Sequence, residues 1–260
     1  MKILFRVDYS NDIGSGHLSR CLTLAYEFSK NSCEVIFITN ENSETHLEIP
    51  FEVVKIKSQG DTSSLVGYKK WLGHLAEDEI KHLSKVLDIH KETQLIVVDH
   101  YGYDKEIESY LKNQNIKTLV FDDLSSEEHS CDYLINQNLI EDPSIYSTLS
   151  PSSYNFVGPE FSLLRDEFIG EKSSPISNKV FFYLGSCPKD IFDKFSTSIE
   201  WLANEFSELI VISEHEIEAR ENISSYKSHP NISQLMKGCD FAIGSCGTTT
   251  WERNCLGLPT

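Results

Sequence analysis

The segment KILFRVDYSNDIGSGHLSRCLTLA, residues 2–25, joins a strand-like run to a helical pattern through a turn that contains two glycines. Its first part, KILFRV (residues 2–7), is rich in the aliphatic and aromatic side chains of a buried strand. Behind the turn, apolar side chains recur at the i, i+3, i+4 and i+7 spacing of an amphipathic helix: Leu18, Cys21, Leu22 and Ala25. The segment therefore predicts a strand, a loop and then a helix from about residue 16 to residue 30.

The same alternation of strand and helix continues along the chain. Further strand-like runs occupy residues 34–39, 51–56, 94–99, 117–123, 179–186, 208–213 and 239–245. Helical patterns occupy residues 74–90, 104–114, 189–206 and 232–238, and a last helix opens within 247–257. Runs such as LIVVD are apolar almost throughout, which is typical of strands buried on both faces. The pattern predicts an α/β protein with doubly wound parallel sheets.

A polar segment divides this pattern into two sets. IGEKSSPISN (residues 169–178) brings Ser, Pro and Gly together, and KVFFYLGS directly after it begins a new strand with a glycine turn. We therefore predict two Rossmann-like domains, residues 1–168 and residues 179–260, joined by a linker.

The composition limits the class of partner. The 260 residues are 40% hydrophobic, which predicts a packed core, and their formal charge of −17 disfavours nucleic acid or an anionic membrane as a partner. An anionic ligand must then be held locally, by backbone amides or a few cations. The seven cysteines are scattered without a Cys-x-x-Cys pair, which disfavours a zinc site. No signal peptide or membrane span is recognisable, so we expect a reduced, cytoplasmic protein.

Polar residues gather at the predicted carboxyl ends of the strands, where ligands bind in open α/β sheets. They are Arg6, Asp8 and the GSGH turn, DHYGYD (99–104), Asp122 and Asp123, GSCP (185–188), and GSCGTTTWE (244–252). Within DHYGYD, Asp104 is expected to cap the next helix. We expect Asp122 and Asp123 to be carboxylates of a turn and not a metal-binding pair, because no further metal-ligating residue lies near them at the spacing of a metal site.

His17 is the distinctive residue of the first turn. Gly14, Ser15 and Gly16 resemble a phosphate loop, but the spacing of a dinucleotide fingerprint and the Gly-Lys-Ser/Thr of a nucleotide loop are both missing. The partial positive charge of a helix N-terminus disfavours imidazolium, so His17 is expected to be a neutral general base. Asp8 is a candidate to fix its tautomer. The alternative is a polar helix N-terminal residue without a catalytic role.

The GSCGTTTWE segment carries the features of a diphosphate site. Its small-residue loop, with Ser245 and Gly247, leads into Thr248 and Thr249, which would present amide and hydroxyl donors to a phosphate at a helix N-terminus. Glu252 is placed to accept hydrogen bonds from ribose hydroxyls. The alternative is an N-cap threonine with a capping-box acid.

Several motifs together resemble the UDP-2,4-diacetamido-2,4,6-trideoxy-β-L-altropyranose hydrolases of pseudaminic acid biosynthesis. The motifs are RVD with IGSGHLSRCLTLA, LIVVDHYGYD, VFDDL, NQN, GPEFSLLRDEF and IGSCGTTTWERNCLGLP, in this order over nearly the whole chain. The resemblance implies a glycosyltransferase-B type of fold, in which the C-terminal domain holds UDP and the sugar points into the interdomain cleft. It also implies a nucleotide-sugar substrate and hydrolysis by water attack on the anomeric carbon, with inversion, a scheme that requires no metal or cofactor.

The resemblance assigns roles to individual residues. His17 would be the catalytic base, Tyr101 of DHYG would lie beside the reacting sugar, and GTTTWE would hold the diphosphate and ribose. Arg165 of LLR would be a further cleft residue, and Asp99 would contact the substrate as well.

This chain departs from the family pattern at two places. In the loop GSCP, which begins with Gly185, Ser186 and Cys187 occupy the places where similar sequences commonly have a second glycine and an aspartate. The family continues past LGLPT with a strand, an Asn-Gln motif and closing helices, so the C-terminal domain is expected to be incomplete and the activity low or absent. Two other functions stay open: a glycosyltransferase that uses the same donor, and a UDP-sugar-binding protein without turnover.

Overall fold

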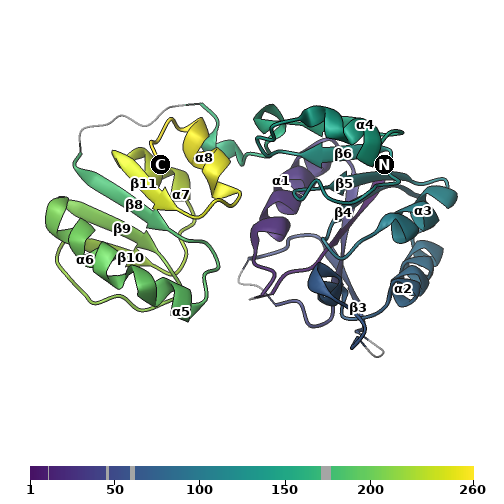
Figure 1. The fold of residues 1–260 in the computed structure, drawn as a ribbon, viewed down its shortest axis with the longest axis horizontal. Coiled ribbons are helices and arrows are strands. Elements are labelled where there is room, and N and C mark those ends of the chain that lie inside the picture. Colours follow the sequence, from purple (N-terminus) through teal and green to yellow (C-terminus); the bar gives the residue numbers. More distant parts are fainter. Residues whose placement is uncertain (11, 45–46, 59–61, 171–176) are drawn as a thin grey trace. The chain divides into compact units, whose positions relative to one another are not determined.

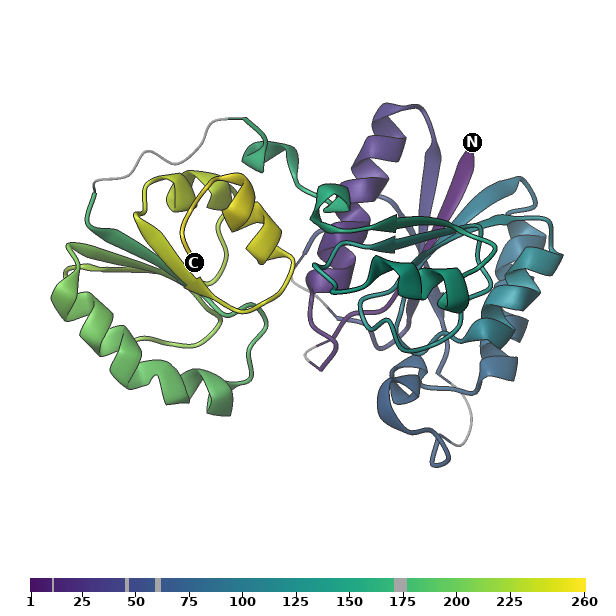
Figure 2. The same ribbon diagram turned by 45° about the horizontal axis from the view of Figure 1, so that its top comes forward.

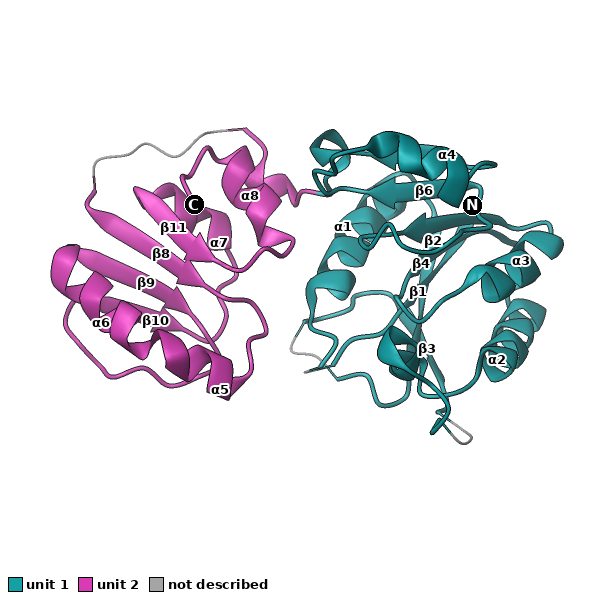
Figure 3. Cartoon of the chain, in the orientation of Figure 1, with its two compact units in different colours: residues 1–163 teal, residues 164–260 magenta. Residues whose placement is uncertain are grey.

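The computed structural model describes residues 1–10, 12–44, 47–58, 62–170 and 177–260 of the chain. The chain divides into two compact units, residues 1–163 and residues 164–260 (Figure 3). Each unit is an open parallel sheet with helices on both of its faces.

The sheet of the first unit has seven strands in the order β3-β2-β1-β4-β5-β6-β7. All its neighbouring strands pair in parallel. The strands are β1 (Lys2–Val7), β2 (Glu34–Asn40), β3 (Glu52–Ile56), β4 (Thr93–Asp99), β5 (Lys117–Phe121), β6 (Tyr133–Asn136) and β7 (Tyr154–Val157). The order changes direction at β1, whose neighbours are β2 and β4. Such a switch point places a crevice at the carboxyl ends of the strands.

Helices cover the two faces of this sheet. They are α1 (Gly16–Lys30), α2 (Ala76–Ile89), α3 (Lys105–Asn113) and α4 (Tyr146–Leu149), with the 3-10 helices η1 (Gly67–Leu72), η2 (Pro143–Ile145) and η3 (Pro159–Phe161). Figure 1 and Figure 2 show α1 on one face and α2 beside α3 on the other. Successive residues of β1 point to opposite faces: Leu4 packs in the α2–α3 core, and Phe5 packs in the α1 core.

The second unit repeats this plan on a smaller scale. Its four parallel strands have the order β10-β9-β8-β11. They are β8 (Lys179–Tyr183), β9 (Glu208–Ile212), β10 (Ile223–Tyr226) and β11 (Phe241–Gly244). The helices are α5 (Lys189–Phe192), α6 (Ser196–Glu205), α7 (Ile232–Lys237) and α8 (Thr249–Cys255), with the 3-10 helices η4 (Asp166–Phe168) and η5 (Asp193–Phe195). Phe182 of β8 packs in the core with α5 and α6, and Phe181 packs in the other core.

The predicted α/β class with parallel sheets is confirmed, and the domain boundary differs from the prediction. Residues 164–168, predicted as the end of the first domain, belong to the second unit. The reason is Phe168, which is 1% exposed and packs with Phe181 and Met236 of that unit. Residues 171–176 of the predicted linker lie outside the described residues.

Some elements were missed because their sequence signals are weak. Strands β6 (YLIN), β7 (YNFV) and β10 (ISSY) are short, and polar side chains interrupt their apolar residues, so they give no clear apolar run. The helical pattern over 189–206 is interrupted by η5, so it forms α5 and α6 instead of one helix. Among the described helices, none combines the length and the apolar character needed to cross a bilayer.

Candidate functional site

The first cluster of predicted site residues lies at the carboxyl ends of β1 and β4. Gly14, at φ +83°, closes the turn by donating its amide to the Ser10 carbonyl at 2.7 Å. Ser15 is the N-cap of α1 and Gly16 its first residue. This turn brings His17 to the end of β4, where its Nδ1 lies 2.6 Å from Asp99 Oδ1.

Asp99 fixes the orientation of His17. The Asp99 carboxylate is fully buried, and the His17 side chain is 11% exposed. A carboxylate only accepts hydrogen bonds, so Nδ1 of the imidazole carries the proton that it donates. In the neutral ring the lone pair is then on Nε2. His17 therefore has the tautomer of a general base that acts through Nε2.

Arg20 completes this buried network. It lies one turn after His17 on α1, and its Nε and Nη2 donate to the two Asp99 oxygens at 2.6 and 2.7 Å. Its Nη1 donates to Asp123 Oδ1 at 2.9 Å. Burial alone would raise the pKa of Asp99, but the Arg20 guanidinium and His17 outweigh it and hold that pKa far below its usual range. Asp99 is therefore a permanent carboxylate. It was predicted to contact the substrate, but its oxygens are bound inside the protein.

Tyr101 lies beside His17, as an edge-to-face pair with ring centroids 4.6 Å apart. Its hydroxyl donates to Asp123 Oδ2 at 2.5 Å. Burial, together with the Asp123 carboxylate, raises the pKa of Tyr101 above its ordinary value. Tyr101 is therefore a neutral side chain in the physiological range and not a second base.

Asp8 does not reach His17, contrary to the prediction. Its Oδ1 lies 2.6 Å from Arg6 Nη1 and accepts the Asn40 amide at 2.6 Å, while its Oδ2 lies 3.1 Å from His100 Nε2. Burial opposes ionisation, but Arg6 and His100 hold the pKa of Asp8 far below its usual range. Since the residue is only 1% exposed, Asp8 is a structural carboxylate and neither a ligand contact nor the partner of His17.

Two aromatic side chains near His17 were missed. Trp71 stacks on Tyr101, with centroids 5.6 Å apart and an interplanar angle of 19°. Tyr68 contacts both of these rings edge-on, at 4.8 Å and 5.1 Å. Their spacing of three residues in GYKKWLG could have indicated this arrangement, because side chains three residues apart lie on the same side of a 3-10 helix.

The second cluster lies in the second unit, at the carboxyl ends of the neighbouring strands β8 and β11. Gly185 has φ +70°, and its carbonyl accepts the Cys187 amide at 2.9 Å in a tight turn that contains Ser186. A Cβ at Gly185 would lie 3.5 Å from Ser245 Oγ, so the two loops are adjacent. Gly247 follows in the second loop, where its carbonyl accepts the amide of Thr250 at 2.9 Å.

Arg253 lies beneath this second loop and was also missed. Its Nη1 donates to Thr249 Oγ1 at 3.2 Å, and its Nη2 donates to the Ser245 carbonyl at 3.1 Å and to Thr250 Oγ1 at 3.2 Å. A Cβ at position 244 would lie 2.2 Å from Arg253 Nη1, so only glycine fits at the end of β11.

The charge of Arg253 is poorly compensated within the unit. The residue is 1% exposed, and burial lowers the pKa of its guanidinium. Arg6 and Arg20 each have two carboxylate partners, whereas the hydrogen bonds of Arg253 within the described chain go to uncharged oxygens. A buried cation of this kind is stabilised by a nearby anion. The loop above it, with Thr248 as the N-cap of α8, is therefore a candidate anion site.

Glu252 and Arg165 form an ion pair. Arg165 Nε and Nη2 donate to the two Glu252 oxygens at 2.8 and 3.1 Å, and Arg165 Nη1 lies 2.8 Å from Glu167. The Glu252 side chain is 2% exposed and that of Arg165 is 33% exposed. The sequence predicts that Glu252 accepts hydrogen bonds from ribose hydroxyls. Because both of its oxygens already accept from Arg165, a ribose would have to share the carboxylate with Arg165.

The described residues contain one group of side chains with the spacing of metal ligands. Donor atoms of His74, Glu79 and His82 lie within 4.8 Å of one another. Glu79 already accepts from Arg6 Nε at 2.6 Å and interacts with His74 Nε2 at 2.5 Å, and it also accepts the hydroxyl of Tyr103. A metal ion would therefore compete with a buried ion pair for Glu79.

The predicted capping role of Asp104 and the predicted turn role of Asp122 are confirmed. Asp104 caps α3 by accepting the amides of Glu106 at 3.1 Å and Ile107 at 3.3 Å. Asp122 accepts the amides of Leu124 at 2.9 Å and Ser125 at 3.1 Å. Asp123 was also predicted to be a turn carboxylate, but it accepts hydrogen bonds from Arg20 Nη1 at 2.9 Å and from the Tyr101 hydroxyl at 2.5 Å instead.

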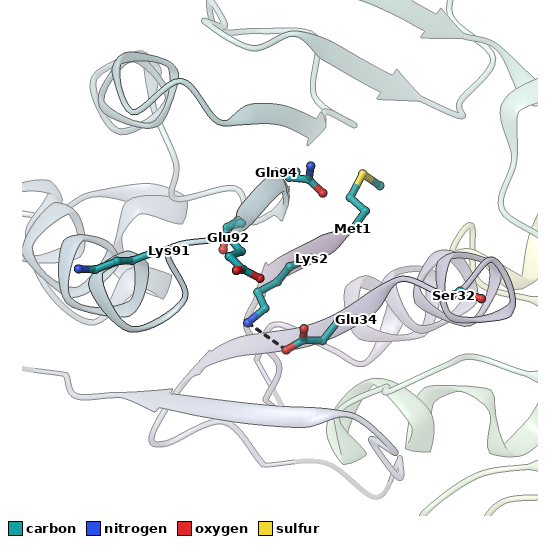
Figure 4. A pocket seen from close by; sticks show the side chains of 8 residues that line it. Met1, Lys2, Ser32, Glu34, Lys91, Glu92 and Gln94 are labelled. Atoms are coloured by element: carbon teal, nitrogen blue, oxygen red, sulfur yellow. Dashed lines mark ion pairs between the residues drawn. The ribbon is translucent and has the colours of Figure 1, made fainter.

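A pocket of about 560 Å³ lies at the opposite end of the first sheet (Figure 4). It is lined by Met1, Lys2, Ser32, Glu34, Lys91, Glu92, Thr93 and Gln94, at the amino ends of β1, β2 and β4. Lys2 and Glu34 form an ion pair of 3.0 Å there. None of the predicted site residues lines this pocket, so it is separate from the His17 cluster.

The comparisons with known proteins agree with the resemblance found in the motifs. No protein-family profile matches the sequence. The chain is 28% identical over 241 residues to the UDP-2,4-diacetamido-2,4,6-trideoxy-beta-L-altropyranose hydrolase of Campylobacter jejuni, covering 91% of this chain and 74% of that protein. It is 24% identical to an uncharacterized protein of Methanocaldococcus jannaschii, and spans about half, 54%, of that relative's length.

Solved structures show the same fold. Os79 from O. sativa in complex with UDP matches with a TM-score of 0.64 at 10% identity, over 100% of this chain and 80% of that one. MurG from Acinetobacter baumannii matches with 0.59 at 10% identity, over 98% and 76%. UGT89C1 from Arabidopsis thaliana complexed with UDP-L-rhamnose matches with 0.60 at 13% identity, over 99% and 77%. These matches confirm the predicted glycosyltransferase-B type of fold.

Proposed function

We propose that this protein hydrolyses a UDP-sugar, and that its substrate is UDP-2,4-diacetamido-2,4,6-trideoxy-β-L-altropyranose, an intermediate of pseudaminic acid biosynthesis. The observation that carries the proposal is His17, a partly exposed imidazole whose Nδ1 is held by the buried Asp99 at 2.6 Å. The similarity to the Campylobacter jejuni hydrolase supports the choice of substrate. The UDP and UDP-sugar complexes of the same fold support a nucleotide-sugar ligand.

The proposed reaction is an inverting hydrolysis at the anomeric carbon. Nε2 of His17 takes a proton from water while the water oxygen bonds to the anomeric carbon. The bond from that carbon to the diphosphate oxygen breaks, and its electron pair leaves with UDP. Asp99 stabilises the imidazolium that forms, because its negatively charged carboxylate accepts the hydrogen bond that Nδ1–H donates, and Nδ1 keeps its proton. A diphosphate is a stable leaving group, so this scheme needs no strong general acid.

The second unit would bind the UDP part. Backbone amides and threonine hydroxyls of the 245–249 loop would donate to the diphosphate, and the charge of the buried Arg253 would compensate its negative charge. Arg165 would share Glu252 with the ribose. The sugar part of the substrate would react at His17.

The direct test is a UDP-release assay with this substrate, in which the anomeric proton of the product is followed by NMR. We expect UDP release in the absence of any acceptor, and a first-formed sugar of inverted anomeric configuration. Release that depends on an added acceptor would indicate a glycosyltransferase instead. Binding of the substrate without any release would indicate a UDP-sugar-binding protein.

Replacing Arg253 tests the diphosphate site. Arg253→Met removes the buried charge, and hydrogen bonds to charged groups contribute about 1.5–3 kcal/mol. We therefore expect UDP to bind roughly 10- to 100-fold more weakly, with uridine affinity unchanged, when both are measured by calorimetry.

Arg253→Lys is the matched control, since it keeps the positive charge and should retain part of the UDP affinity. Thermal unfolding of each variant measures the structural role of the residue separately. An equal loss of affinity for UDP and uridine would show that Arg253 does not act through the phosphates.

A further inference from the structure

The 3-10 helix η1 holds two aromatic side chains on one side. A 3-10 helix has three residues per turn, so Tyr68 and Trp71 lie one above the other. Leu72 is 2% exposed and anchors the helix in the α2–α3 core. Gly73 ends the helix at φ +70°, and a Cβ there would lie 2.5 Å from Ser58 Oγ. The segment is therefore held in a defined conformation on the body of the first unit.

These two rings extend the surface next to His17. Trp71 stacks on Tyr101, Tyr68 contacts both rings, and the centroid of Trp71 lies 6.2 Å from that of His17 in an edge-to-face pair. We call Tyr68, Trp71 and Tyr101 the aromatic wall. Tyr68 is 46% exposed and the other two rings are partly exposed, so the wall is not part of the closed core.

The chemistry of the wall favours an apolar ligand group. The charged residues of η1 lie between the aromatic positions, and Lys69 is paired with Asp104 at 2.9 Å. Tyr101 remains neutral because its pKa is raised by burial and by the neighbouring Asp123. Aromatic faces bury C–H and methyl groups favourably, whereas a hydroxyl placed against them loses its hydrogen bonds to water.

We propose that the aromatic wall is the surface against which the sugar packs during reaction at His17, and that Tyr68 and Trp71 select sugars with methyl groups in place of hydroxyls. This inference rests on the proposed function and deepens it. The proposed substrate carries a methyl at C6 and one on each of two acetamido groups, whereas UDP-N-acetylglucosamine has hydroxyls at C4 and C6. An apolar pocket discriminates by roughly 10- to 200-fold for each methylene-sized difference.

The test compares kcat/KM for the proposed substrate and for UDP-N-acetylglucosamine. We expect Trp71→Ala to lower kcat/KM for the methyl-rich substrate by roughly 10- to 100-fold and to change that for UDP-N-acetylglucosamine by less than about threefold. Tyr68→Ala should act in the same direction with a smaller effect. Lys70→Ala, on the same helix, and Trp71→Phe, which keeps a ring, should retain the selectivity. An equal loss with both substrates, or no loss, would overturn the proposal.

A binding experiment separates this inference from the proposed function. Saturation-transfer NMR with free 2,4-diacetamido-2,4,6-trideoxy-L-altropyranose and with N-acetylglucosamine needs no turnover. We expect the methyl protons of the first sugar to receive saturation from the wild type and not from Trp71→Ala. If this saturation pattern is observed but the wild type releases no UDP, the proposed hydrolase function is wrong, whereas the aromatic wall is still a sugar-binding surface. If UDP is released but the selectivity is the same in Trp71→Ala, the function stands and the wall has no such role.

Discussion

Hydrolysis by the His17→Asn variant is expected to be about 10²–10⁴-fold slower than by the wild type, with little change in UDP affinity. Asparagine keeps a polar group of similar size at this position but cannot accept a proton from water. The residue belongs to the first unit, whereas the proposed contacts to UDP belong to the second, so binding and catalysis should separate. The measurements are single-turnover UDP release and calorimetric titration with UDP.

The control for this experiment is His229→Asn, which removes a partly exposed histidine of the second unit that interacts with the backbone of Asn231. It should hydrolyse the substrate at the wild-type rate. Undiminished turnover in His17→Asn would remove His17 from the role of base. A loss of UDP affinity equal to the loss of rate would assign it to binding instead.

Asp99→Asn is expected to affect both catalysis and stability. Asparagine cannot provide the negative charge that faces Arg20 and stabilises the imidazolium of His17, so hydrolysis should fall, but no further than in His17→Asn, because Asp99 acts through His17. Breaking a buried ion pair by removing one partner costs about 3–5 kcal/mol. Because Arg20 keeps its second partner, Asp123, at 2.9 Å, we expect a loss near the lower end of this range. Urea unfolding followed by circular dichroism measures it.

The double variant Asp99→Asn/Arg20→Met distinguishes a broken ion pair from a general packing defect. In the Asp99→Asn variant, the charge of Arg20 has lost one of its two carboxylate partners. The Arg20→Met substitution removes this charge, so the buried carboxamide at position 99 then faces an apolar side chain. The double variant should therefore be more stable than the sum of the two single losses predicts, by about 1–3 kcal/mol. Additive losses, or an Asp99→Asn variant as stable as the wild type, would contradict the importance of the Arg20–Asp99 pair.

Much of the fold followed from local sequence patterns. Apolar runs predicted β1, β2, β4, β5, β8 and β9, and the helical spacing behind the first turn predicted α1 with its observed bounds, Gly16–Lys30. These signals are local because a strand or helix is defined by the periodicity of its own side chains. Since parallel strands end at one edge of a sheet, the sequence also indicated the edge at which the His17 cluster lies.

The pairing of side chains within the cluster was decided by the tertiary structure. The sequence suggested Asp8 as the partner of His17 because it is only nine positions away. The sheet places β4 beside β1 and thereby brings Asp99 to His17 across 82 positions of the chain. Asp8 forms an ion pair with Arg6 instead. The periodicity of the sequence does not show which of the two carboxylates, Asp8 or Asp99, contacts His17.

By itself, then, the sequence determined the α/β class, the strand ends that carry polar residues, and the motifs shared with a family of UDP-sugar hydrolases. Only the tertiary structure decided that Asp99 and Arg20 hold the imidazole, that Trp71 and Tyr68 lie beside it, and that Arg253 lies beneath the second loop. The physical reason is that hydrogen bonds and ring contacts depend on the distance between atoms in space, and chain folding sets that distance independently of separation in sequence.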